Sequence, residues 1–180
     1  MQDEHSVFGD VVSVDATYTT NQYNMKFVPF TGVNHHLQSV FLGAAFLDNE
    51  KIESYEWLFK TFLKTMGGIA PHLIITDEDA SMKAAIAQIL PETVHRLCMW
   101  HIMEKVPERV GPSIRADEDF WKLLNKCVWG SENPDEFESQ WNFIMTNIWA
   151  HGKGVVFHKV CYPPIMDSAI LYGHTSSRSP

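Results

Sequence analysis

Two acidic residues lie in short β-type runs, where their carboxylates could hold a metal ion. Asp15 lies within the run 11–18, and Asp77 ends the run 72–77. An isolated anion is costly to bury, so an Asp inside an otherwise apolar strand indicates that a positive charge meets it. Adjacent strands lie about 4.8 Å apart, so facing carboxylates could share one divalent ion. Because Mg²⁺ prefers oxygen ligands, the pair predicts a magnesium site for phosphoryl transfer.

The same acids have a structural alternative. Asp15 could lie at a strand end, and Asp77 or Asp79 could cap the helix that follows, which would not exclude a metal. A working phosphoryl-transfer site also needs a third acidic ligand. Glu138 lies beside the apolar stripe of a late helix and is most simply a solvated residue, so it is not assigned. We therefore expect the third carboxylate to be missing.

Cys98 and His101 have the spacing of half a zinc site. Structural zinc needs four ligands, and no second Cys/His pair follows at a suitable distance. His95 precedes Cys98 by three residues, while Cys127 and His151 are remote in sequence. We favour a buried Cys and a hydrogen-bonded His at a strand-to-helix junction, with zinc as the weaker alternative.

The hydrophobic pattern predicts the elements that position these residues. Three β-type runs come first, and the short polar breaks between them favour an antiparallel meander. Helices and strands then alternate, and two more helices carry apolar stripes. The predicted order is strands near 11–18, 27–33 and 38–47, a helix from Ile52 to a stop at Gly67-Gly68, strand 72–77, helix 79–89, strand 93–98, a helix from Trp100, and helices around 120–128 and 133–148. His35 and His36 are expected in a surface turn between strands.

This order matches the ribonuclease-H-like α/β plan, in which the first and fourth strands are parallel neighbours. The predicted fold is a mixed sheet, with three antiparallel strands and then parallel strands, flanked by helices and followed by a truncated helical extension. We expect a core over 1–112 and a helical segment over 113–149 that starts an insertion. Periodicity stops after that, so 150–180 is expected to be a poorly ordered tail.

Composition limits the possible partners. The 180 residues carry a formal charge of −8 without a Lys/Arg cluster, so the chain alone is expected to bind DNA weakly or not at all. No apolar run approaches the roughly 18 residues of a membrane span, and the acidic N-terminus does not match a secretory signal. Three cysteines, Cys98, Cys127 and Cys161, suit a reducing compartment.

Several motifs are spread over roughly residues 7–148. They are FGDVVSVDATY (8–18), NQY (21–23), FTGVNHH (30–36), SYEWLF (54–59), MGG (66–68), ITDED (75–79) and HRLCMWH (95–101), with Phe137, Glu138 and Trp141 further on. Together these motifs resemble the Mutator-like-element (MULE) transposase domain. Their pattern is similar to its domesticated plant version, the far-red impaired response / far-red elongated hypocotyl family of nuclear regulators.

The resemblance implies a ribonuclease-H-like catalytic core that uses Mg²⁺ and an Asp, Asp, Glu triad. Asp15 and Asp77 match its first two positions. The third acid of the family lies beyond a helical insertion in a Ser-, Glu- and Asn-rich motif, which does not occur here. The family's zinc-binding N-terminal domain and its C-terminal SWIM zinc finger are not matched either. Residues 150–180 match nothing in the pattern and are interpreted as a truncated, alternatively spliced or frame-shifted end.

The leading hypothesis is a transposase-derived fragment related to nuclear transcription regulators, without strand-transfer activity. The resemblance implies DNA as a partner of full-length relatives, and homo- or hetero-oligomers with family members. One alternative is a residual metal-dependent transposase or nuclease. Another is a non-functional gene remnant, which would melt without a cooperative transition.

Overall fold

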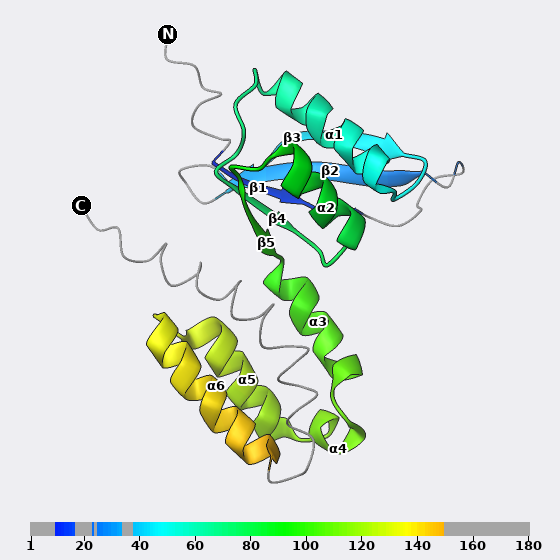
Figure 1. Cartoon of the computed structure of the whole chain (residues 1–180). Helices are drawn as coiled ribbons and strands as arrows, with labels where there is room; N and C mark the ends of the chain where they lie inside the picture. The colour runs from blue at the N-terminus through cyan, green and yellow to red at the C-terminus, as the bar shows by residue number, and fades with distance from the viewer. Residues whose placement is uncertain (1–9, 17–22, 24, 34–37, 150–180) are drawn as a thin grey trace, which may run out of the picture. The chain divides into compact units, whose positions relative to one another are not determined.

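The computed structural model describes residues 10–16, 23, 25–33 and 38–149 (Figure 1). The chain forms two compact units, Met1–Arg96 and Leu97–Pro180. The predictions for His35, His36, His151, Cys161 and the tail 150–180 lie outside the described residues.

The first unit contains a five-stranded mixed sheet with the order β3-β2-β1-β4-β5. Strands β1 and β2 pair antiparallel, as do β2 and β3, whereas β1 and β4 are parallel. This arrangement confirms the predicted ribonuclease-H-like sheet and the parallel pairing of the first and fourth strands. The strands are β1 (Val11–Val14), β2 (Lys26–Val33), β3 (Ser39–Leu47), β4 (Leu73–Thr76) and β5 (Val94–Leu97).

Helices α1 (Ile52–Thr65) and α2 (Ala80–Ile89) belong to the core of this unit. The Phe30 ring of β2 stacks on Phe62 of α1 with centroids 4.3 Å apart, and meets Phe59 edge-on at 6.2 Å. Burying such aromatic and aliphatic side chains supplies most of the driving force for packing a helix on a sheet. The residues of β1 that alternate with its buried valines remain half-buried.

Helix α1 ends at the predicted glycine stop. Gly67 and Gly68 have φ angles of 68° and 82°, in the left-handed region that favours glycine. The Gly68 amide donates to the Leu63 carbonyl at 2.8 Å, which satisfies one of the last carbonyl groups of the helix.

The described part of the second unit is mainly helical and has its own core. Its helices are α3 (Met99–Arg109), α4 (Pro112–Arg115), α5 (Glu118–Gly130) and α6 (Pro134–Trp149). Buried residues of all four helices form one cluster, in which the Phe137 and Trp141 rings stack at 5.9 Å. Asn133 caps α6, because its Oδ1 accepts the Glu136 amide at 2.9 Å. None of the helices in the described ranges is both long and apolar enough to cross a bilayer.

Candidate metal centre

The parallel pairing of β1 and β4 brings Asp15 and Asp77 to the same level of the sheet. Their Cα partners are Val11 with Leu73, Val12 with Ile74, and Ser13 with Ile75. Each step advances one residue on both strands, so two further steps beyond the last pair reach Asp15 and Asp77. Neighbouring strands are separated by about 4.8 Å, a distance at which two carboxylates can share a cation.

The structure corrects the predicted place of Asp15 within its strand. Strand β1 ends at Val14, so Asp15 follows the strand instead of lying inside it. Asp15 is half-buried and continues the side of β1 that includes Ser13, opposite the buried Val12 and Val14. A carboxylate at a strand end keeps part of its hydration, so its burial costs less than the sequence interpretation assumed.

The two roles considered for Asp77 and Asp79 fall to different residues. Asp79 is the N-cap of α2, and its Oδ1 accepts the Met82 amide at 2.7 Å. The Oδ1 of Asp77 accepts the Asp79 amide at 3.1 Å, which holds the turn between β4 and α2. The helix cap is therefore supplied by Asp79, and Asp77 remains a candidate ligand.

A buried hydroxyl links this turn to β5. Thr76, the last residue of β4, is only 1% exposed. Its Oγ1 donates to the Asp77 carbonyl at 2.8 Å and lies 2.8 Å from the His95 Nε2. Burial, together with smaller contributions from the charges of Lys83 and Arg96, lowers the pKa of His95 from 6.5 to about 4. The ring is therefore neutral at neutral pH.

Sequence reasoning missed this contact. It considered His95 only for its distance from Cys98. The available signal was the position of His95 in the predicted strand 93–98, the next strand along the chain after the one that ends in Thr76 and Asp77.

The donor set of Asp15 and Asp77 fits a hard divalent cation, because both ligands are carboxylates. A Mg²⁺ ion bound there would supply charge stabilisation for phosphoryl oxygens. Among the described residues, no group of three or more His, Cys, Asp or Glu side chains could hold a metal. Glu138 is exposed on α6, in agreement with its interpretation as a solvated residue.

The possible zinc ligands lie at the start of α3. Cys98 is the residue before the helix and His101 lies in its first turn, where it meets Trp100 edge-on at 4.8 Å. Cys98 is partly exposed, so the expectation of a buried Cys at this position is wrong. In the ranges that the structure describes, no third ligand completes the pair.

Cys127 is a core residue. Its Sγ lies 3.6 Å from the Phe137 carbonyl. Burial, with a smaller contribution from Glu136, raises the pKa of the Cys127 thiol to about 12. A thiol with this pKa stays protonated at neutral pH and is a poor nucleophile and metal ligand.

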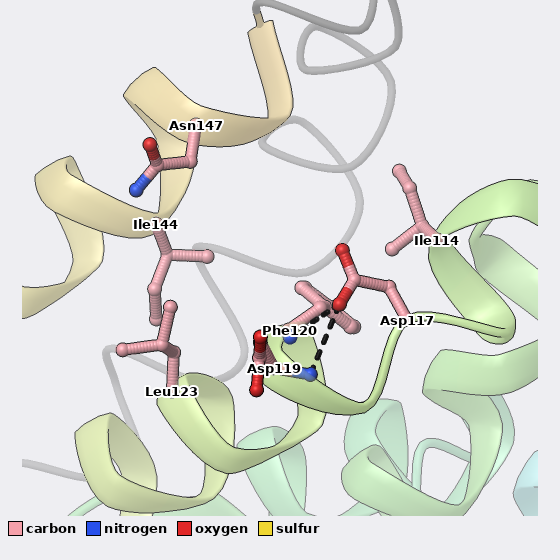
Figure 2. A pocket seen from close by; sticks show the side chains of 7 residues that line it. All are labelled: Ile114, Asp117, Asp119, Phe120, Leu123, Ile144 and Asn147. Atoms are coloured by element: carbon pink, nitrogen blue, oxygen red, sulfur yellow. Dashed lines mark hydrogen bonds between the residues drawn. The ribbon is translucent and has the colours of Figure 1, made fainter.

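A small cavity in the second unit, of about 190 Å³, contains none of the predicted site residues (Figure 2). It is lined by Ile114, Asp117, Asp119, Phe120, Leu123, Ile144 and Asn147. Asp117 caps α5 by accepting the Asp119 and Phe120 amides at 3.0 and 3.1 Å. Asp119 pairs with Lys122 at 3.2 Å. The acids of this cavity therefore have structural roles.

Comparison with solved structures gives only distant similarities. One is the HTLV-2 integrase catalytic core domain, with 12% identity, a TM-score of 0.35, and coverage of 74% of this chain and 83% of the integrase chain. Another is a simian T-cell lymphotropic virus intasome in complex with a PP2A regulatory subunit. It has 13% identity, a TM-score of 0.36, and coverage of 74% and 47%.

Sequence comparison gives stronger similarities, among them to two proteins of Arabidopsis thaliana. Protein FAR-RED IMPAIRED RESPONSE 1 is 40% identical over 186 residues, covering 98% of this chain and 22% of the relative. Protein FAR1-RELATED SEQUENCE 5 is 42% identical over 134 residues, covering 74% and 17%. The first alignment therefore includes most of residues 150–180, the segment in which motifs alone gave no family match. The chain spans about a fifth of the length of these relatives.

The family model of the MULE transposase domain matches residues 11–105. The match includes β1, β4 and both candidate aspartates. It agrees with the motif resemblance and with the sheet order. The chain belongs to the MULE transposase domain family.

Proposed function

We propose that this chain is a transposase-derived domain that binds a divalent cation through Asp15 and Asp77 and acts in DNA-associated transcriptional regulation. On this proposal the domain works in the nucleus, and the chain by itself performs no strand transfer. Its own contribution is contact with other proteins, including family members. The observation that supports the proposal is the parallel β1–β4 register, whose continuation by two residues would pair Asp15 with Asp77.

Charge supports a regulatory role over independent DNA processing. Duplex DNA is bound mainly through Lys and Arg at its phosphates, and affinity falls as fewer phosphates are neutralised. The chain has 14 Lys and Arg residues against 22 Asp and Glu residues. On this proposal, DNA is therefore not contacted by this chain alone.

A residual metal-dependent nuclease or transposase is the second candidate, and the same aligned aspartates favour it. Two carboxylates with a substrate phosphate are a common ligand set for Mg²⁺. The two candidates share the metal site and differ in whether phosphodiester chemistry follows.

DNA cleavage separates these candidates. We expect the purified chain, with Mg²⁺ or Mn²⁺ and supercoiled duplex DNA, to give no nicking or strand transfer above that of Asp15→Ala. The expected reason is that two carboxylates position one ion without completing a two-metal site. Nicked product that forms with the wild type and disappears in Asp15→Ala would replace the regulatory proposal with the enzymatic one.

A further inference from the structure

We propose that His95 is a positioning residue for the candidate magnesium site, because its ring fixes the Asp77 main chain through the hydroxyl of Thr76. This inference rests on the proposed metal-binding role of Asp77. It assigns a role to a β5 side chain that is itself no metal ligand. The three groups are joined by two contacts of 2.8 Å, from Thr76 Oγ1 to the Asp77 carbonyl and to His95 Nε2.

The hydrogen count of the hydroxyl fixes the direction of both bonds. A Thr hydroxyl has one hydrogen and two lone pairs, whereas a carbonyl oxygen can only accept. The Thr76 hydrogen therefore goes to the Asp77 carbonyl. The remaining contact requires His95 Nε2 to donate, so the neutral ring carries its proton on Nε2 and leaves Nδ1 unprotonated.

The burial of Thr76 leaves its hydroxyl dependent on these two hydrogen-bond partners. Thr76 is 1% exposed, so water does not compete for its hydroxyl. Buried polar groups are almost always hydrogen-bonded, and such bonds strengthen in a low-dielectric surrounding. Loss of the His95 donor would leave the Thr76 oxygen without its second partner, and loss of the hydroxyl would release the Asp77 carbonyl.

Asp77 is consequently held from two sides. Its carbonyl accepts from Thr76, and its Oδ1 accepts the Asp79 amide at 3.1 Å. Hydrogen-bond partners that orient ligating residues commonly change metal affinity by about 10- to 100-fold when they are removed. The contact with Thr76 therefore controls how the Asp77 carboxylate is presented at the end of β4.

The first experiment measures Mg²⁺ affinity of the full chain by calorimetric titration. We expect Thr76→Val to raise the Mg²⁺ Kd by about 10-fold or more, and Thr76→Ser, which keeps the hydroxyl, to restore it. Thr93→Val is the matched control. Thr93 is also buried, and its Oγ1 donates at 2.8 Å to the Pro71 carbonyl, which precedes β4 at its other end. Asp77→Asn gives the background of non-specific binding to the acidic chain.

The second experiment determines which ring nitrogen of His95 carries the proton. Two-dimensional ¹H–¹⁵N correlation of the ring nitrogens in the uniformly labelled chain, assigned with His95→Gln, should show the Nε2–H tautomer at pH 7. The Nδ1–H tautomer would mean that Thr76 donates to His95, and it would overturn the inference.

The outcomes separate this inference from the proposed function. In one outcome, the wild type binds Mg²⁺ more tightly than Asp77→Asn, but Thr76→Val and Thr93→Val have equal Mg²⁺ affinity. This result would contradict the positioning role and would support the metal site. Equal Mg²⁺ affinity of the wild type and Asp77→Asn would contradict both the metal site and the positioning role. If Thr76→Val fails to fold, the wild-type tautomer and the Mg²⁺ Kd of His95→Leu, which has no donor for Thr76, decide the inference. The inference requires the Nε2–H tautomer and a Kd raised by about 10-fold or more, and an unchanged Kd would contradict it.

Discussion

At the scale of single residues, His95 lies in surroundings that disfavour the protonated form of its ring. Burial, followed by the charges of Lys83 and Arg96, lowers its pKa from 6.5 to about 4. Between these pH values the unfolded chain binds a proton that the folded chain does not. The free energy of unfolding therefore rises with pH across this window and reaches its full value above pH 6.5.

This linkage gives a pH prediction. As the pH falls from 6.5 to 4, His95 should remove at most about 3 kcal/mol from the free energy of unfolding, since one pKa unit corresponds to about 1.36 kcal/mol. Urea unfolding at pH 7 and pH 4.5 should show a smaller loss in His95→Gln than in the wild type. His72→Gln, at an exposed histidine just before β4, should keep the wild-type loss. Identical losses in all three proteins would contradict the burial effect.

At the scale of elements, the junction between β4 and α2 combines a strand end, a turn and a helix cap within a few residues. Asp77 holds the turn and Asp79 caps the helix. Facing carboxylates at strand spacing repel each other when no cation lies between them. Without metal, removal of one charge from the pair should therefore preserve or raise the Tm, whereas removal of the cap should lower it.

Two substitutions at this junction separate metal binding from capping. Asp77→Asn keeps an Oδ1 that accepts the Asp79 amide, so its Tm without metal should equal or exceed that of the wild type. Its Tm should no longer rise with Mg²⁺, because ligand-linked stabilisation requires binding. Asp79→Ala should lose about 1 kcal/mol with the cap, yet keep the Mg²⁺-induced rise. Thermal melts of the wild type and both variants, with and without Mg²⁺, measure these Tm values.

One result at this junction would favour a purely structural role for Asp77. It is a clear loss of stability in Asp77→Asn together with a wild-type Tm that Mg²⁺ leaves unchanged. Asp117→Ala, which removes the cap of α5, shows the cost of a lost cap in the other unit.

At the scale of the whole molecule, the described residues form two hydrophobic cores that share no residue. One includes the sheet with α1 and α2, and the other includes α3 to α6. The proposed metal site belongs entirely to the first unit. Because binding stabilises only the structure that forms the site, its effect should be confined to that unit.

Hydrogen exchange measured by mass spectrometry tests this confinement. Mg²⁺ should slow amide exchange in β1, β4 and the first turn of α2, and leave α5 and α6 unchanged. Asp77→Asn, as the matched control, should show no Mg²⁺ effect in either unit. Equal protection of α5 and α6 in the wild type would mean that the two units unfold together.

Local sequence patterns predicted most elements of the fold. Hydrophobic periodicity is set by the repeat of each element, so it predicted α1, α2 and α6 near their observed bounds. The glycine pair stops α1 because its backbone conformation is a property of glycine itself. The order of strands and helices also predicted that β1 and β4 are neighbours, since few topologies accommodate that order.

The tertiary structure decided the details that depend on residues distant in sequence. Strand β1 ends at Val14, the last residue that pairs with β2, whereas its pairing with β4 ends at Ser13, and this limit was not visible in the run 11–18. Thr76 and His95 are nineteen positions apart, and only the packing of neighbouring strands makes them hydrogen-bond partners. The sequence by itself determined which residue types could bind a metal. The β1–β4 register determined which residues occupy corresponding positions on the two strands, because register depends on hydrogen bonds between strands and not on the composition of either strand.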